Sequence, residues 1–410
     1  MKILRNTRRN ENHVVFTARI ERIASNGAGI LTYNGQKFFV DKTAPLDRVT
    51  VKVKEMHKGW GTAELLRIEE PSPFRTPCVC PLAGRCGGCS LQHLAYETQV
   101  EEKVAILKES FVRIGSFKEP PAVQIRRSKG FGYRNRVQFH RFKSSLPGFK
   151  VKQSDEIIQV AACPVADEGI NKALAEKRIT PPVEKDRWTV YSYKDTFLME
   201  GKNRRGSVVL LDKRLLLDAG VFFQSNASAL ETLIKDVVSI AEEAVSGDST
   251  PLVGPLAADV YCGVGTFAVF LRDLRRFKGI DLVEENKTAL SLACGNISAA
   301  GASGAGENYY AVSADAWAKG NKNRYGFIIA DPPREGLSPG VRAWLCAQVA
   351  SQSAQGTPVF AYVSCNPATL ARDSEALVKS GYALSSLAFY DFYPQTPHIE
   401  SLAVFQRSRL

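Results

Sequence analysis

From about residue 221 to residue 410, the chain alternates short apolar runs with segments of helical spacing. Strands that alternate with helices in this way form a mostly parallel sheet, which the helices cover on both faces. The pattern therefore predicts a doubly wound α/β domain in this part of the chain. The predicted strands cover residues 257–261, 278–282, 309–313, 327–330, 357–363 and 384–390.

The first half of the chain has a different pattern, and its 410 residues are enough for two or three domains. Residues 1–12 are polar and basic, and we expect them to be disordered. Residues 72–220 form a predicted central α+β domain, with a helix at 94–114 that could pack on the C-terminal domain. Residues 13–71 predict a small β-barrel of the oligonucleotide-binding type, with strands at 14–20, 29–33, 37–40, 48–53 and 61–66.

Charge and composition narrow the class of partner. The net charge of +12 and the pI near 9.2 favour a polyanion, with nucleic acid as the first candidate. No run approaches the roughly 20 apolar residues of a membrane span, and the N-terminus lacks a signal core. We therefore expect a cytoplasmic protein with reduced cysteines or metal-bound thiolates, no membrane contact and no obligate protein partner.

Four of the nine cysteines lie within one short segment, at Cys78, Cys80, Cys86 and Cys89. Four thiolates can hold either an iron–sulfur cluster or zinc, and the spacing alone does not choose between them. Cys163 could complete the set from a distance. The segment lacks the C-x3-C-x2-C spacing of radical enzymes, so a structural or RNA-positioning role is favoured.

A glycine-rich loop, Gly263 to Thr266, follows one predicted strand and precedes a helical run. Glycines at this point let the backbone approach a nucleotide-like ligand closely. Asp281, which we expect at the end of the next strand, could accept both ribose hydroxyls. Asp331 ends a third strand before two prolines, and Asp315 is a weaker candidate for the adenine side.

Cys365 directly follows the apolar run that ends at Val363-Ser364. The C-terminal end of a buried strand is where an open α/β sheet presents residues to ligand, and a thiolate there can attack a substrate covalently. Glu400 lies downstream, after a proline-rich segment, and could serve as the proton acceptor.

The segment 121–150 contains eight Lys or Arg, no Asp or Glu, and several aromatic residues. Cations for phosphates beside rings for bases are what single-stranded RNA binding requires. Arg134, Asn135 and Arg136 are the predicted RNA contacts. The alternative is a solvated strand face whose aromatic residues belong to the core.

With these motifs, nearly the whole chain resembles the RNA uracil-5-methyltransferases that use S-adenosylmethionine. The resemblance is to the form with an N-terminal TRAM domain and an iron–sulfur cluster. It is carried by Ser364-Cys365-Asn366-Pro367-Ala368-Thr369, Asp331-Pro332-Pro333-Arg334, the 394–400 segment ending in Glu400, and the Cys80, Cys86 and Cys89 spacing. It implies a C-terminal Rossmann-like methyltransferase domain, with Cys365 as nucleophile and Glu400 as general base.

The resemblance also implies the ligands of both cofactors. A [4Fe-4S] cluster would be held by Cys80, Cys86, Cys89 and Cys163, which leaves Cys78 as a spare. Asp281 stands where the family usually has Glu, so ribose binding is expected to be looser. The methyl-donor contacts would be Gln224, Tyr261, Gly263, Gly265, Thr266, Asp281, Asp315 and Asp331.

The implied reaction makes 5-methyluridine in structured RNA through a covalent bond between Cys365 and uracil C6, with Glu400 removing the C5 proton. 23S ribosomal RNA is the expected substrate, and the T-loop of transfer RNA is the alternative. An amino-group methyltransferase would need no nucleophilic thiol. A non-catalytic RNA-binding assembly factor would need neither Cys365 nor Glu400.

Overall fold

The computed structural model describes residues 14–143, 145–245, 254–301, 306–350 and 358–407. Its contacts divide the chain into two compact units. Unit 1 comprises Met1–Ile106 with Gln395–Pro397, and unit 2 comprises Leu107–Pro394 with His398–Leu410. The predicted disorder of residues 1–12 lies outside the described residues, and the division into three domains stays a prediction.

Unit 1 contains a six-stranded sheet in the order β1-β5-β6-β4-β3-β2, in which only β4 and β6 pair in parallel. Alternate residues point inward and form an apolar core that includes Phe16, Phe38 and Val51. The strands agree with the five predicted ones and add the short β2. They are β1 (Val15–Arg19), β2 (Arg22–Ile23), β3 (Gly29–Tyr33), β4 (Gln36–Val40), β5 (Arg48–His57) and β6 (Trp60–Glu70).

The segment after β6 is anchored to this sheet by a buried ion pair. Asp47, which is fully buried, accepts hydrogen bonds from Arg75 Nη2 at 2.7 Å and from the Ser72 amide at 2.8 Å. Burial alone would raise the pKa of Asp47, but the hydrogen bonds from Arg75 and the backbone lower it below its ordinary value. Helix α1 (Tyr96–Arg113) follows, close to the predicted 94–114.

Unit 2 begins within α1 and contains an antiparallel sheet in the order β10-β9-β8-β11-β12, followed by the hairpin β13-β14. Phe139 and Trp188 are fully buried in this sheet, with ring centroids 6.0 Å apart. Its elements are β8 (Arg136–Phe142), β9 (Leu146–Lys150), β10 (Ile157–Gln159), α2 (Glu168–Ala175), β11 (Arg187–Tyr193), β12 (Thr196–Met199), β13 (Arg205–Leu210) and β14 (Lys213–Asp218).

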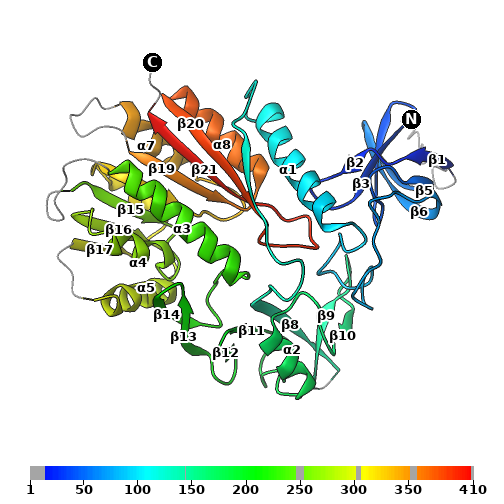
Figure 1. Cartoon of the computed structure of the whole chain (residues 1–410), viewed down its shortest axis with the longest axis horizontal. Helices are drawn as coiled ribbons and strands as arrows, with labels where there is room; N and C mark the ends of the chain where they lie inside the picture. Colours follow the sequence, from blue (N-terminus) through cyan, green and yellow to red (C-terminus); the bar gives the residue numbers. More distant parts are fainter. Residues whose placement is uncertain (1–13, 144, 246–253, 302–305, 351–357, 408–410) are drawn as a thin grey trace, which may run out of the picture. The chain divides into compact units, whose positions relative to one another are not determined.

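The rest of unit 2 is built on an eight-stranded sheet in the order β17-β16-β15-β18-β19-β21-β20-β7 (Figure 1). The first five strands are parallel, as the alternation in the sequence predicted. β21 is antiparallel to both of its neighbours. The strands are β7 (Val123–Arg126), β15 (Leu256–Val260), β16 (Gly279–Val283), β17 (Gly306–Tyr310), β18 (Tyr325–Ala330), β19 (Val359–Ser364), β20 (Tyr382–Tyr390) and β21 (Glu400–Arg407).

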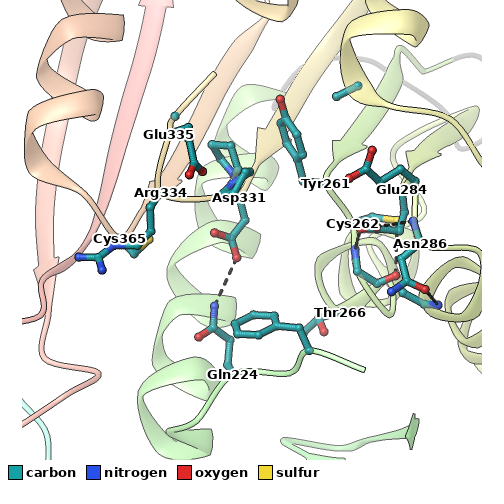
Figure 2. Close-up of a pocket in the computed structure, with 18 of the residues that line it drawn as sticks. Gln224, Tyr261, Cys262, Thr266, Glu284, Asn286, Asp331, Arg334, Glu335 and Cys365 are labelled. Atoms are coloured by element: carbon teal, nitrogen blue, oxygen red, sulfur yellow. Dashed lines mark hydrogen bonds between the residues drawn. The ribbon is translucent and has the colours of Figure 1, made fainter. Parts of the chain in front are cut away.

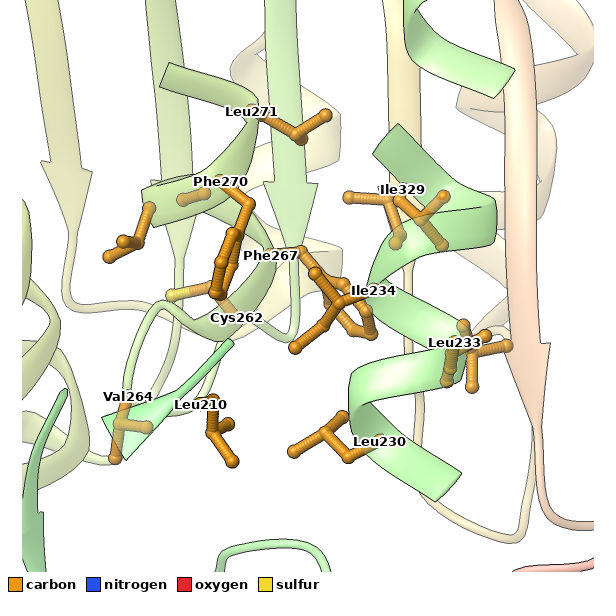
Figure 3. Packing of buried hydrophobic residues seen from close by; sticks show 14 of the residues in the cluster. Leu210, Leu230, Leu233, Ile234, Cys262, Val264, Phe267, Phe270, Leu271 and Ile329 are labelled. Carbon is orange, nitrogen blue, oxygen red and sulfur yellow. The ribbon is translucent and has the colours of Figure 1, made fainter. Parts of the chain in front are cut away.

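Helices pack on both faces of this sheet. On one face, Leu230 and Ile234 of α3 and Phe267 of α4 form a core with Ile329 of β18 (Figure 3). On the other face, the Tyr362 hydroxyl of β19 donates to Asp373 of α8 at 2.9 Å. The helices are α3 (Ala227–Ala244), α4 (Thr266–Asp273), α5 (Lys287–Ala299), α6 (Ala314–Gly320), α7 (Pro339–Ala350) and α8 (Pro367–Lys379).

The sequence misplaced one strand of this sheet. Residues 309–313 were predicted as a strand, but β17 ends at Tyr310. Ser313 instead caps the start of α6, since its side chain accepts a hydrogen bond from the Ala316 amide. Among the described residues, no helix combines the length and apolar character that crossing a membrane requires.

Candidate active site

Four residues that directly follow the parallel strands line one cavity of about 1100 Å³. Tyr261 follows β15, Glu284 follows β16, Asp331 follows β18 and Cys365 follows β19. Parallel strands place their carboxyl ends at one edge of a sheet, which is where open α/β folds bind ligands. Tyr261, Asp331 and Cys365, which the sequence predicts as site residues, therefore lie together because each one follows a parallel strand of the same sheet.

The cavity has two ends (Figure 2). Arg334 and Cys365 lie at one end, and Glu284, Asn286 and Thr266 gather at the other. Asp331 lies between them, where its carboxyl accepts a hydrogen bond from the Gln224 side chain at 3.3 Å. The site is therefore extended, with the glycine loop and the cysteine at opposite ends.

Glu400 reaches the cavity from an antiparallel strand. Ser364 of β19 pairs with Ser401 of β21, so the next pair in the same register is Cys365 and Glu400. β21 begins at Glu400, at the same sheet edge at which β19 ends. The carboxyl of Glu400 is almost fully buried, and its Oε1 has no hydrogen-bond partner among the described residues.

This environment favours the neutral forms of the site's acids. Burial raises the pKa of the Cys365 thiol to about 12, the carboxyls of Glu400 and Asp331 add to the effect, and Arg334 partly offsets it. Burial also raises the pKa of Asp331 to about 7, although the hydrogen bond from Gln224 opposes this. Burial and then the nearby Asp331 raise the pKa of Glu400 well above its ordinary value. Positive charge in the cavity would favour ionisation of all three groups.

The two loop glycines have different roles. Gly263 adopts φ +55° and lines the cavity, and a Cβ built there would meet no atom within 4 Å. Gly265 adopts φ +77°, and a Cβ there would lie 2.9 Å from Cβ of Ala293 in α5. Gly265 therefore allows close helix packing and does not line the cavity, whereas Gly263 leaves room for a ligand.

Two backbone amides in and after the glycine loop already donate hydrogen bonds to carboxylates. Glu284 Oε2 accepts from the Gly263 amide at 3.0 Å, and Asp259 Oδ2 accepts from the Ala268 amide in the first turn of α4 at 3.0 Å. In a dinucleotide site, such amides bind the pyrophosphate. Here a pyrophosphate would have to displace these two carboxylates and lie beside their negative charges, which is unfavourable. The arrangement favours a nucleoside ligand without phosphate.

The prediction that Asp281 ends its strand and contacts the ligand is wrong. Asp281 is the middle residue of β16 and is fully buried. Its carboxyl accepts from Asn308 at 2.8 Å and from the Tyr325 hydroxyl at 2.5 Å. The acid at the end of the strand is Glu284, three residues later. The signal that could have located it was the apolar Val283, which continues the strand.

The remaining predicted contacts lie on the glycine-loop side. Thr266 begins α4 and lines the cavity. Asp315 also lines it, but its Oδ1 accepts from the Ser338 hydroxyl at 2.8 Å and from the Gly340 amide at 2.9 Å. Asp315 therefore also holds the start of α7.

Of the three predicted RNA contacts, two line the cavity. Arg134 and Arg136 do so, and the Arg136 guanidinium lies 5.7 Å from the centre of the Phe222 ring, which is 61% exposed. Asn135 is buried, and its side chain donates to the Ser192 carbonyl at 2.8 Å and accepts from the Ala227 amide at 2.7 Å. The prediction for Asn135 is therefore corrected to a structural role. Sequence reasoning missed Phe222, Arg334 and Tyr393, which also line the cavity.

The cysteine segment shows local order without an assembled metal site. Cys80, Cys86, Cys89 and Cys163 are partly buried, and Cys78 is exposed. The Gly88 amide donates to the Cys86 sulfur at 3.4 Å. Within the described residues, no three His, Cys, Asp or Glu side chains are grouped so that they could hold a metal ion.

Known proteins share this sequence and fold. The sequence model of the tRNA (uracil-5-)-methyltransferase family matches residues 319–408. An uncharacterized RNA methyltransferase of Treponema denticola is 31% identical, over 92% of this chain and 95% of that protein. The 23S rRNA (uracil(1939)-C(5))-methyltransferase RlmD of Pseudomonas fluorescens is 27% identical, over 95% of this chain and 91% of that protein.

The chain belongs to the RNA (uracil-5-)-methyltransferase family. This confirms the resemblance to the RNA uracil-5-methyltransferases, while the TRAM domain and the iron–sulfur cluster stay predictions. The solved structure of Pyrococcus abyssi tRNA (uracil-54, C5)-methyltransferase in complex with S-adenosyl-L-homocysteine has the same fold, with a TM-score of 0.70 and 23% identity. It covers 95% of this chain and 100% of its own.

The two glycines give a first prediction. Gly265→Ala should lower the free energy of unfolding by about 1–3 kcal/mol, because it combines left-handed backbone with a clash against α5. Gly263→Ala should cost less stability but weaken binding of S-adenosylhomocysteine, because its methyl group enters the cavity. Urea denaturation and calorimetry measure the two effects. The reverse pattern would contradict the assignment.

Asn135 gives a second prediction. Asn135→Ala should lower the free energy of unfolding by about 1–3 kcal/mol, because it leaves the buried Ala227 amide and Ser192 carbonyl without their side-chain partners. Gln138→Ala, at an exposed position of β8, is the matched control and should change stability by less than about 0.5 kcal/mol. Equal stabilities for the two variants would rule out the structural role.

The raised pKa of Cys365 gives a third prediction. The thiolate reacts with iodoacetamide and the thiol does not, so alkylation of Cys365 should keep rising with pH and reach no plateau below about pH 10. Glu400→Gln removes a nearby negative charge, should lower the thiol pKa and should speed alkylation at pH 9. Mass spectrometry resolves Cys365 from the other cysteines. A rate that is half-maximal near pH 8.5 and has levelled off by about pH 10 would show an ordinary thiol.

Proposed function

We propose that this protein transfers a methyl group from S-adenosylmethionine to C5 of a uridine in 23S ribosomal RNA. The observation that carries the proposal is that Cys365 and Glu400 directly adjoin the last printed pair of β19 and β21, Ser364 and Ser401, and line one cavity. They do so in a member of the RNA (uracil-5-)-methyltransferase family. A nucleophile beside a potential base is what covalent activation of uracil requires. An amino-group methyltransferase would have no use for this pair.

The residues between Asp331 and the glycine loop suit S-adenosylmethionine. Gln224 Oε1 is buried without a partner among the described residues, and the open space beside Gly263 can receive a ligand. We assign Glu284 to the ribose hydroxyls in place of Asp281, and Tyr261, Thr266 and Asp315 to the rest of the nucleoside. Asp331 and Glu400 would offset the positive charge of a sulfonium. When bound, S-adenosylmethionine supplies an electrophilic methyl group.

Cys365 would activate the base. Uracil C5 is a poor nucleophile because it belongs to a conjugated enone. When the Cys365 sulfur bonds to C6 and its proton is lost, the electron pair of the C5–C6 bond moves onto C5 and O4, and C5 becomes able to accept a methyl group. Because the resting thiol has a raised pKa, its ionisation should depend on positive charge in the cavity.

Glu400 would complete the reaction. After methylation, C5 carries both a methyl group and a proton, and the Glu400 carboxylate accepts that proton. The electron pair left on C5 re-forms the C5–C6 bond as the carbon–sulfur bond breaks, which releases Cys365. Glu400 must then be ionised at that stage, although burial favours its neutral form when the cavity holds no ligand.

The substrate is assigned as structured RNA with an unstacked uridine. Arg134 and Arg136 provide cations in the cavity that Cys365 lines, and the exposed Phe222 ring offers a stacking surface. The relatives named RlmD favour 23S ribosomal RNA, since they align with almost the whole chain. Transfer RNA is the second candidate, because the P. abyssi enzyme with the same fold acts on it.

The finer domain assignments belong to the same proposal. We infer that the six-stranded sheet of unit 1 is a TRAM domain that binds RNA. We also infer that Cys80, Cys86, Cys89 and Cys163 hold a [4Fe-4S] cluster, on the basis of their spacing and of the Gly88 amide that donates to Cys86. Iron and sulfide analysis of protein purified without oxygen would test the cluster. No step of the reaction depends on it.

A fourth prediction tests the mechanism. Labelled S-adenosylmethionine should give 5-methyluridine in unmodified 23S ribosomal RNA with the wild type, and Cys365→Ala should reduce the rate by at least about 10³-fold. Glu400→Gln should accumulate a covalent protein–RNA complex that survives denaturation, because the C5 proton stays in place. Cys294→Ala, at an exposed cysteine of α5, is the matched control and should retain activity.

The outcomes separate the alternatives. Label in transfer RNA alone would keep the mechanism and change the substrate. Full activity of Cys365→Ala would exclude covalent catalysis. No methyl transfer to either RNA, with bound cosubstrate, would favour the RNA-binding assembly factor.

A further inference from the structure

One tryptophan of this chain is placed differently from the others. Trp188, Trp317 and Trp344 are buried, with at most 7% of each residue exposed, whereas Trp60 is 42% exposed. Trp60 begins β6, and its ring stacks on that of His57, the last residue of β5, at 4.1 Å between centroids. The Phe39 ring meets Trp60 edge-on at 5.7 Å. Contacts from both neighbouring strands therefore hold this exposed ring in place.

The strand register places these rings on the outer face of the sheet. Trp60 pairs with His57 on one side and with Lys37 on the other. Phe38, between Lys37 and Phe39, points into the core, so its two neighbours point outward. We call the outer surface formed by Lys37, Phe39, His57, Lys58 and Trp60 the Trp60 face.

Charge on the Trp60 face is less balanced than at the opposite end of β5 and β6. There, Arg48 and Arg19 both pair with Glu70, and Arg67 pairs with Glu69. Within the described residues, by contrast, Lys37 and Lys58 form no ion pair. The nearby acids are Glu55, which lies 3.7 Å from His57, and Glu64, which lies 4.0 Å from Lys54. The Trp60 face thus combines an exposed ring with two uncompensated lysines.

We propose that the Trp60 face binds an unpaired nucleotide of the RNA substrate, with a base stacked on Trp60 and phosphates near Lys37 and Lys58. This rests on the proposed function for its substrate class and adds an RNA site outside the catalytic cavity. Stacking on a fixed ring tolerates any base, and lysines neutralise the backbone of a single strand. The alternative is an aromatic pair that only stabilises the hairpin, which would leave the lysines without a role.

A fifth prediction tests this site by direct binding. Labelled single-stranded oligouridylate is titrated against the full-length protein, with anisotropy reporting affinity and tryptophan fluorescence reporting contact. Trp60→Ala should weaken binding by about 5- to 150-fold. Trp60→Phe keeps a stacking ring, so it should retain most of the affinity but lose the fluorescence quenching. Leu66→Ala, at a residue of β6 that is 52% exposed, is the matched control and should bind as the wild type does.

A second pair of variants keeps the test valid if Trp60→Ala disturbs the hairpin. Lys37→Ala and Lys58→Ala should each reduce the slope of log affinity against log salt by about one. If all the Trp60 and lysine variants kept the wild-type affinity and salt slope, the proposal would be overturned. A face that binds a protein in place of RNA would give this same result. If oligouridylate quenched Trp60 but no 5-methyluridine formed in any RNA, the RNA site would stand and the proposed reaction would fail.

Discussion

The candidate active site depends on the antiparallel insertion of β21 between β19 and β20. An all-parallel sheet would present only residues that follow strands, such as Asp331 and Cys365. Because β21 runs in the opposite direction, its first residue reaches the same edge, and the hydrogen-bond register sets Glu400 opposite Cys365. A shift of one residue in this register would turn Glu400 to the other face of the sheet. The ladder between these two strands therefore determines whether the pair can act together.

The second constraint is electrostatic. A thiol and two carboxyls share a buried region, and each raises the cost of ionising another, so the empty cavity favours their protonated forms. A positively charged ligand would lower that cost, and Arg334 already does so in part for Cys365. On the proposed mechanism, the reactivity of the thiol would therefore depend on occupation of the cavity, and Cys365 would stay protonated when no methyl donor is present.

Residues at the ends of parallel strands could be predicted from the sequence, whereas residues positioned by tertiary pairing could not. Cys365, Asp331 and the glycine loop could be located because apolar runs mark parallel strands. Glu400 was found by its motif, but the strand that it begins was not predicted, since its position depends on pairing with a segment far away in the sequence. Asp281 was misplaced because one more apolar residue, Val283, extends β16, so that the first residue after the strand is Glu284. Trp60 could not be singled out from the sequence. Alternation within a strand shows which side chains face outward, but not which of these stay exposed to solvent in the folded chain.

The segment Arg134-Asn135-Arg136 links the two arginines that line the cavity to Gln224 and Asp331. Arg134 and Arg136 line the cavity, whereas Asn135 between them is buried. The Asn135 amide donates to the Ser225 carbonyl at 2.7 Å, and its side chain accepts from the Ala227 amide, so it holds the turn that carries Gln224. Gln224 in turn donates to Asp331. A change at the arginines that displaced this segment would therefore reach Asp331 through two hydrogen-bonded steps. The proposed RNA contacts and the proposed methyl-donor contacts would then share one support.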